Sequence, residues 1–124
     1  RYYDEITRMD AWIGRYLDTL EERGLREETI AIYLSDNGLP FPRAKGSLYD
    51  AGIRIPYIWS WPARIEPGSR RDDLASTIDL APTLLESAGV PPPDEMEGHS
   101  ILGTFRQQND KLLTAESGND VFLP

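Results

Sequence analysis

The most constraining feature of the 124-residue sequence is a continuous apolar run, residues 29–34, that ends abruptly in polar residues. The run reads Thr-Ile-Ala-Ile-Tyr-Leu, and Ser35-Asp36-Asn37-Gly38 follows it. An uninterrupted apolar run, rather than an alternating one, is typical of a strand covered on both faces in a parallel sheet. Such sheets bind ligands beyond the carboxyl ends of their strands, so the polar segment is the first candidate site.

The residues before this strand predict a helix over 4–24. Apolar side chains recur there every three or four residues, which gives one apolar stripe with charged residues on the other faces. The stripe consists of Ile6, Met9, Ile13, Leu17 and Leu20. Gly24 suits the left-handed residue just past a helix C-terminus. Helix, short loop and buried strand together predict an α/β fold.

The rest of the chain predicts an extended segment over 53–61, a polar surface loop over 63–73, a short buried helix over 79–89 and a final strand from Lys111. Prolines near both ends of the extended segment restrict it to a sheet edge or an irregular path. The helix begins at Asp79, a favoured N-cap residue. Strands interleaved with helices agree with the α/β expectation.

Composition narrows the function classes. Hydrophobic residues make up 40% and charged residues 27% of the chain, which is ordinary for a globular domain with one modest core. The net charge of −8 argues against nucleic acid or an acidic membrane surface as a partner. No apolar run reaches the roughly 18 residues of a membrane span. The helical pattern starts almost at Arg1 without a Met or a signal segment, so we expect the chain to be cut from a longer protein.

Asp36 and Asn37 place a carboxylate and an amide oxygen side by side at the end of the strand. Hard divalent cations such as calcium select oxygen ligands, whereas zinc would favour imidazole or thiolate, and the chain has one histidine and no cysteine. The other interpretation of Asn37-Gly38 is a tight hairpin turn. Pro40 and Pro42 disfavour it, because they remove backbone donors where the returning strand would begin.

At this point the sequence resembles a known family. The order of its motifs is similar to the C-terminal part of a sulfatase catalytic domain, over roughly residues 2 to 103. The segments that carry the resemblance are Ser35-Asp36-Asn37-Gly38, Lys45-Gly46-Ser47-Leu48-Tyr49-Asp50-Ala51-Gly52-Ile53-Arg54-Ile55-Pro56, Trp61-Pro62, Ser76-Thr77-Ile78-Asp79-Leu80-Ala81-Pro82-Thr83-Leu84-Leu85 and Gly89-Val90-Pro91. The segment 38–42 is also similar to the heparan N-sulfatase branch.

The resemblance implies an alkaline-phosphatase-like mixed, mainly parallel sheet flanked by helices, of which residues 1–124 form the C-terminal portion. It implies that Asp36 and Asn37 bind calcium and that Lys45 is the basic residue that contacts sulfate. Arg43 ranks second for that contact, because its spacing to the following glycines fits less well. The remaining metal ligands, the catalytic histidines and the formylglycine nucleophile, made from Cys or Ser in Cys/Ser-X-Pro-X-Arg, are expected upstream and outside this chain.

Three other polar features are expected to be structural or solvated: Arg54, His99 and the acidic pair 72–73. The leading hypothesis is a segment of a calcium-dependent sulfatase acting on sulfate esters or N-sulfates of a small molecule or glycan, inactive by itself. A phosphodiesterase or phosphonate hydrolase of the same superfamily is an alternative, although relatives with two zinc ions often have His where this chain has Asn37. A non-catalytic module for a sulfated or acidic ligand is another.

The expected partner of the chain is the missing N-terminal half of the domain, or a second copy, to cover exposed core. The resemblance is compatible with a periplasmic, secreted or lysosomal protein.

Overall fold

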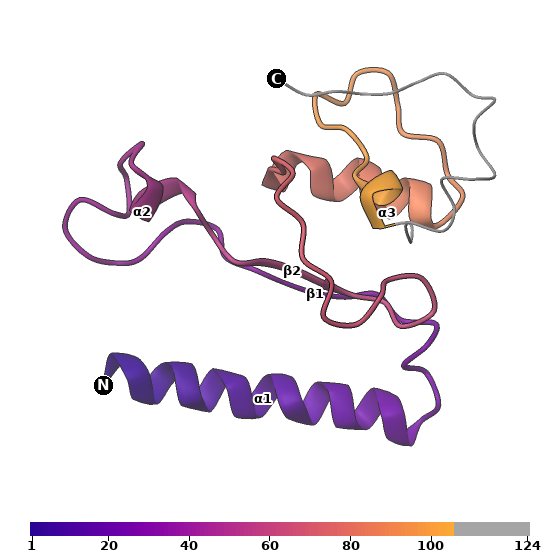
Figure 1. Cartoon of the computed structure of the whole chain (residues 1–124), viewed down its shortest axis with the longest axis horizontal. Helices are drawn as coiled ribbons and strands as arrows, with labels where there is room; N and C mark the ends of the chain where they lie inside the picture. The colour runs from indigo at the N-terminus through magenta and orange to yellow at the C-terminus, as the bar shows by residue number, and fades with distance from the viewer. Residues whose placement is uncertain (106–124) are drawn as a thin grey trace. The chain divides into compact units, whose positions relative to one another are not determined.

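The computed structural model describes residues 1–105, and the chain divides into two compact units, Arg1–Ala63 and Arg64–Pro124 (Figure 1). The first unit contains α1 (Tyr2–Glu22), β1 (Ala31–Leu34), α2 (Asp50–Ile53) and β2 (Tyr57–Ser60). The second contains η1 (Thr77–Asp79), α3 (Leu80–Ser87) and η2 (Leu102–Phe105). The strand expected from Lys111 lies outside the described residues.

The helix expected over 4–24 is confirmed as α1. It ends in a Schellman-type cap: the Gly24 amide donates to the Glu21 carbonyl at 2.9 Å and the Leu25 amide to the Leu20 carbonyl at 2.9 Å. Gly24 has φ +65°, the left-handed conformation that glycine adopts without steric cost. No helix within residues 1–105 has the length and apolar character needed to cross a membrane.

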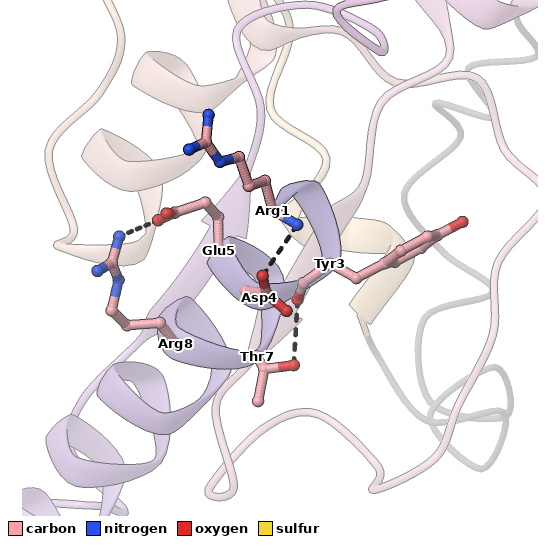
Figure 2. A network of polar contacts seen from close by, with 6 residues as sticks. All are labelled: Arg1, Tyr3, Asp4, Glu5, Thr7 and Arg8. Carbon is pink, nitrogen blue, oxygen red and sulfur yellow. Dashed lines mark hydrogen bonds and ion pairs between the residues drawn. The ribbon is translucent and has the colours of Figure 1, made fainter.

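Polar contacts tie the first two turns of α1 together (Figure 2). The amino group of Arg1 lies 2.9 Å from the Asp4 carboxylate, Arg8 pairs with Glu5, and the Thr7 hydroxyl donates to the Tyr3 carbonyl at 3.1 Å. All of these side chains are exposed, so each ion pair contributes little to stability. The helix depends on its apolar face instead.

That apolar face has few contacts within its unit. The Tyr33 hydroxyl of β1 lies 3.7 Å from the Met9 sulfur, and the rings of Tyr2 and Phe41 meet edge to face with centroids 5.2 Å apart. Yet Ile6 is 40% exposed and Met9 is 39% exposed. The stripe predicted from periodicity is therefore present, but the described residues leave much of it uncovered.

The extended segment expected over 53–61 forms β2, and β1 and β2 pair antiparallel with Ala31 opposite Ser60 and Leu34 opposite Tyr57. An antiparallel pair is compatible with a mixed sheet. A long loop, residues 35–56, joins the strands and carries α2 (Figure 1), so the tight Asn-Gly hairpin is absent, as the prolines indicated. All four residues of β1 are only half-buried. The expected cover on both faces is not supplied by residues 1–105.

In the second unit, Asp79 joins two segments. Its carboxylate accepts hydrogen bonds from the Ser76 amide at 2.8 Å and from the His99 amide at 2.9 Å. Thr83 of α3 is fully buried, donates to the Asp79 carbonyl at 2.5 Å and accepts from the Ile101 amide at 3.0 Å. Asp79 is the N-cap residue of α3, as expected, but its carboxylate caps η1 rather than α3. The segment after α3, at His99 and Ile101, is thus held against the N-terminal end of α3.

The single modest core expected from composition is not found within residues 1–105. Only Ala44, Gly52, Pro82 and Thr83 are buried there. Two belong to the loop after β1 and two to α3, one pair in each unit. The loop is therefore the best-packed part of the first unit, although its sequence contains no regular hydrophobic pattern.

Candidate functional site

Asp36 and Asn37 lie directly after the end of β1, as the sequence indicated. Asp36 is exposed, and Asn37 is half-buried with its side-chain amide nitrogen donating to the Gly38 carbonyl at 2.8 Å. Because a carbonyl only accepts, this bond identifies the amide nitrogen and leaves Oδ1 on the other side. No hydrogen bond to Oδ1 comes from the described part of the chain. The Ser35 hydroxyl donates to the Asn37 carbonyl at 2.7 Å and fixes the turn.

Two glycines close the loop at its base. The Gly38 amide donates to the Gly52 carbonyl at 2.9 Å, and the Leu39 amide donates to the Ala51 carbonyl at 3.2 Å. A Cβ on Gly38 would overlap the Ala51 carbonyl, and a Cβ on Gly52 would overlap the carbonyls of Ser47 and Ala44. These are backbone atoms, so a side chain at Gly38 would push the two loop ends apart, and a side chain at Gly52 would push that residue away from the turn over 44–47. We call this contact the glycine clamp.

Inside the glycine clamp the chain packs on itself around Ala44, which is 3% exposed. The Ala44 amide donates to the Phe41 carbonyl at 3.1 Å, the Lys45 amide to the Leu39 carbonyl at 2.9 Å, and the Ser47 hydroxyl to the Ala44 carbonyl at 2.8 Å. The backbone of Lys45 is thereby fixed, while its side chain is exposed. Arg43 and Lys45 flank the buried alanine as two exposed cations of one loop.

Arg43 has φ +65° and is the one non-glycine residue among 1–105 with a positive φ. A residue with a Cβ is strained there by roughly 1–3 kcal/mol, a cost most often met at functional positions. Arg43 and Tyr49 line an open cavity of about 590 Å³. Tyr49 was not singled out from the sequence. Its place in the motif 45–56 was visible, but its position beside Arg43 depends on how the loop folds.

The donor set fits a hard cation in part. Asp36 offers an exposed carboxylate, and Asn37 has its amide oxygen free of described partners. Residues 1–105 contain no cluster of three or more His, Cys, Asp or Glu side chains that could hold a metal. Since calcium takes six to eight oxygens, these two residues can supply only a share of a coordination shell.

The letters of the nucleophile motif do occur once, as Ser60-Trp61-Pro62-Ala63-Arg64, so the expectation that the motif lies only outside this chain needs correction. The structure gives Ser60 a different task. It is the last residue of β2, paired with Ala31, and its hydroxyl accepts a hydrogen bond from Arg26. The candidate site follows Leu34, three residue pairs away and so roughly 10 Å along the strands. Ser60 therefore lies at the wrong end of the strand pair to serve that site.

The remaining polar features take no part in this site. His99 is exposed and uses its backbone amide to hold Asp79. Asp72 and Asp73 are exposed, as expected for solvated loop acids. Arg54 is exposed, and no ion pair within residues 1–105 involves it.

Comparison with known proteins agrees with the motifs. The family profile described as "Sulfatase" matches residues 1–90. The chain is similar to an ulvan-active sulfatase of Formosa agariphila, with 36% identity over 93% of this chain and 19% of the relative. Human arylsulfatase A is 36% identical over 89% of this chain and 25% of its own length. Human N-sulphoglucosamine sulphohydrolase is 35% identical over 73% of this chain and 18% of its own length.

A solved structure, of a protein in complex with its substrate D-glucosamine-2-N,6-O-disulfate, superposes with a TM-score of 0.75. It is 33% identical in sequence, and the match covers 82% of this chain and 22% of that one. The chain spans about a fifth to a quarter of the length of these relatives. The likeness supports the alkaline-phosphatase-like α/β fold. On the extent of the profile match and the identity to several sulfatases, this chain belongs to the sulfatase family.

Proposed function

We propose that the chain is the C-terminal segment of a calcium-dependent sulfatase that hydrolyses sulfate esters or N-sulfates. The observation that carries the proposal is the loop closed by the glycine clamp. It joins an oxygen-donor pair at the end of β1 to two exposed cations on a fixed backbone. Oxygen donors suit a hard cation, and the loop cations suit a sulfate group.

Asp36 and Asn37 are proposed to supply two of the calcium ligands. The hydrogen bond from the Asn37 amide nitrogen to the Gly38 carbonyl supports this role, because it holds the amide in one orientation with Oδ1 available. A calcium ion, when bound, supplies positive charge that offsets the negative charge of a sulfate group. The other ligands and the formylglycine nucleophile are proposed to come from a part of the enzyme outside this chain.

Lys45 is proposed to bind a sulfate oxygen and to offset charge on the leaving oxygen as the S–O bond breaks. A charge already held in place stabilises a transition state more than a mobile one, because no reorganisation accompanies the reaction. The backbone bond from Lys45 to Leu39 supports this role, because it fixes the main chain from which the side chain extends. Arg43 remains the second candidate for this contact.

The proposed substrate class is a sulfated sugar. Sequence similarity to an N-sulphoglucosamine sulphohydrolase and structural similarity to a protein bound to D-glucosamine-2-N,6-O-disulfate support it. A chain that only binds a sulfated ligand without catalysis is the competing interpretation. The two are distinguished by whether loss of Lys45 changes turnover or only binding.

The test is Lys45→Ala in the full-length enzyme, with an aryl sulfate as substrate. Removing a preorganised charge of this kind lowers kcat/KM by about a hundredfold or more, roughly 3 kcal/mol, and we expect that loss here. Because the side chain is exposed, the melting temperature should stay unchanged.

Arg43→Ala is the matched control, since it removes the neighbouring cation from the same loop. We expect a smaller loss from it on a substrate with one sulfate. If Arg43→Ala abolishes turnover while Lys45→Ala stays within about threefold of the parent, the two roles are exchanged. If neither variant loses activity, the loop does not contact the scissile sulfate and the proposal is wrong.

A further inference from the structure

Arg43 has an unusual combination of properties. Its backbone is in the left-handed region, its side chain is exposed, and no acidic side chain within residues 1–105 forms an ion pair with it. Glycine occupies the other four positive-φ positions of that stretch, Gly24, Gly46, Gly68 and Gly89. A turn alone would be served better by glycine, so the strain at residue 43 indicates that the guanidinium itself has a task.

The loop also keeps the backbones of Arg43 and Lys45 apart. Ala44 between them is buried, and its carbonyl accepts both the Ser47 amide at 2.9 Å and the Ser47 hydroxyl at 2.8 Å. The Arg43 carbonyl accepts from the same hydroxyl at 3.1 Å. The backbones of the two cationic residues are therefore held on either side of an anchored residue. With Lys45 assigned to the sulfate that is cleaved, the second exposed cation of the loop is available for a second anionic group.

The chemistry of the cavity indicates what carries that group. Arg43 offers a planar fork of N–H donors that binds an oxyanion through two parallel hydrogen bonds. Tyr49 lines the same cavity and is 73% exposed, so its ring is available to lie against the C–H face of a sugar. The cavity is open to solvent, so a sugar can reach both side chains from outside.

We propose that Arg43 and Tyr49 form an accessory subsite that selects sugars with two anionic groups: Lys45 takes the sulfate to be cleaved, and Arg43 takes a second sulfate or a carboxylate. This inference rests on the proposed sulfatase function and adds a specificity determinant to it. Arg43 makes no bond to the reacting atoms in this scheme. It raises affinity for one class of substrate and leaves the chemical step to Lys45 and the rest of the enzyme.

The test uses the full-length enzyme and three sugars: D-glucosamine-2-N,6-O-disulfate and the two monosulfated sugars that retain only the N-sulfate or only the 6-O-sulfate. The variant is Arg43→Gly, because glycine accepts φ +65° and so removes the guanidinium without disturbing the turn. We expect KM for the disulfated sugar to rise about tenfold or more, as loss of a charge-assisted contact does, with kcat within about twofold. For the monosulfated sugar that is cleaved, kcat/KM should stay within about threefold.

Two further variants and a control test the subsite more closely. Arg43→Lys keeps the charge but loses the fork, so we expect it to restore only part of the preference for the disulfated sugar. Tyr49→Ala should raise KM for the disulfated sugar and for the monosulfated sugar that is cleaved, since the ring would contact the sugar in both. Arg70→Ala, an exposed arginine of the second unit, is the control for net charge and should leave all three sugars unaffected.

An equal loss by Arg43→Gly on disulfated and monosulfated sugars overturns the subsite, because Arg43 would then bind the group being cleaved. No change on either sugar overturns it as well. Both outcomes leave the sulfatase proposal standing, since the parent enzyme is active in each. A parent enzyme that releases sulfate from none of the three sugars, nor from an aryl sulfate, contradicts the proposed function itself.

Discussion

At the scale of single residues, Asn37 combines a proposed metal ligand with a chemically vulnerable position. In an Asn-Gly pair the glycine nitrogen can attack the asparagine side-chain carbonyl carbon and expel ammonia, and water then opens the ring to aspartate or isoaspartate. Here the Gly38 nitrogen donates its hydrogen to the Gly52 carbonyl at 2.9 Å, and the Asn37 amide donates to the Gly38 carbonyl at 2.8 Å. The glycine clamp thus restrains the attacking nitrogen, and the Asn37–Gly38 hydrogen bond restrains the side chain that it would attack.

We predict that Asn37 in the folded full-length enzyme resists deamidation and that Gly52→Ala accelerates it. A Cβ at residue 52 overlaps the carbonyls of Ala44 and Ser47, and so displaces the Gly52 carbonyl that holds the Gly38 amide. Peptide mass spectrometry after incubation at mildly alkaline pH measures the change. Gly14→Ala is the matched control, since a Cβ at that helical position meets nothing within 4 Å. Equal rates in the parent, Gly52→Ala and urea-unfolded protein would show that the clamp gives no protection.

At the scale of elements, Asp79 joins two segments of the second unit in addition to preceding α3. The sequence predicted an N-cap for the helix over 79–89, and α3 does begin at Leu80. The carboxylate, however, binds the amides of Ser76 and His99, residues separated by 23 positions. Each such bond to a charged acceptor stabilises by about 1.5–3 kcal/mol. Asp79 therefore stabilises the packing of η1, α3 and the segment around His99 against one another.

We predict that Asp79→Ala raises the hydrogen-exchange rates of the Ser76 and His99 amides by about tenfold or more, because both lose their acceptor. Hydrogen exchange read out by NMR or mass spectrometry on the intact protein measures this locally. Asp94→Ala, which removes an exposed acid from the same unit, should leave both amides unchanged. Unaltered exchange in Asp79→Ala would mean that other groups hold the two segments together.

At the scale of the whole molecule, the chain leaves large apolar side chains exposed. Along α1 they include Tyr2, Ile6, Met9, Trp12 and Tyr16, and β1 is nowhere buried. Exposed apolar surface of this kind marks an interaction face. The partner we propose is the remainder of the sulfatase polypeptide, a proposal in keeping with the fact that the chain spans about a fifth to a quarter of its relatives.

We predict that the 124-residue chain alone does not hydrolyse an aryl sulfate, because its one match to the nucleophile motif begins at Ser60, at the far end of β2 from the candidate site. Release of the chromogenic product, measured against a buffer blank, is the assay. Turnover abolished by Ser60→Ala would assign the nucleophile to that serine, and turnover that survives this change would place it elsewhere in the chain. Either result would contradict the prediction.

The sequence by itself determined the elements whose signals are local. The stripe of α1, the stop at Gly24, the strand before Ser35 and the helix after Asp79 depend on short-range periodicity and capping, and the structure confirms each. The motif around Asp36, Asn37 and Lys45 was enough to find the family.

Only the tertiary structure decided how these parts meet. The contact of Gly38 with Gly52, the left-handed Arg43, the cavity it shares with Tyr49 and the antiparallel register of β1 and β2 all depend on residues distant in sequence. The motif match at Ser60 shows that a sequence pattern alone does not place a residue in a site. Residues 60–64 match the nucleophile motif in type and spacing, but the strand register places Ser60 away from the candidate site. Spacing along the chain constrains local geometry, whereas the position of a side chain relative to a site depends on the packing of the whole.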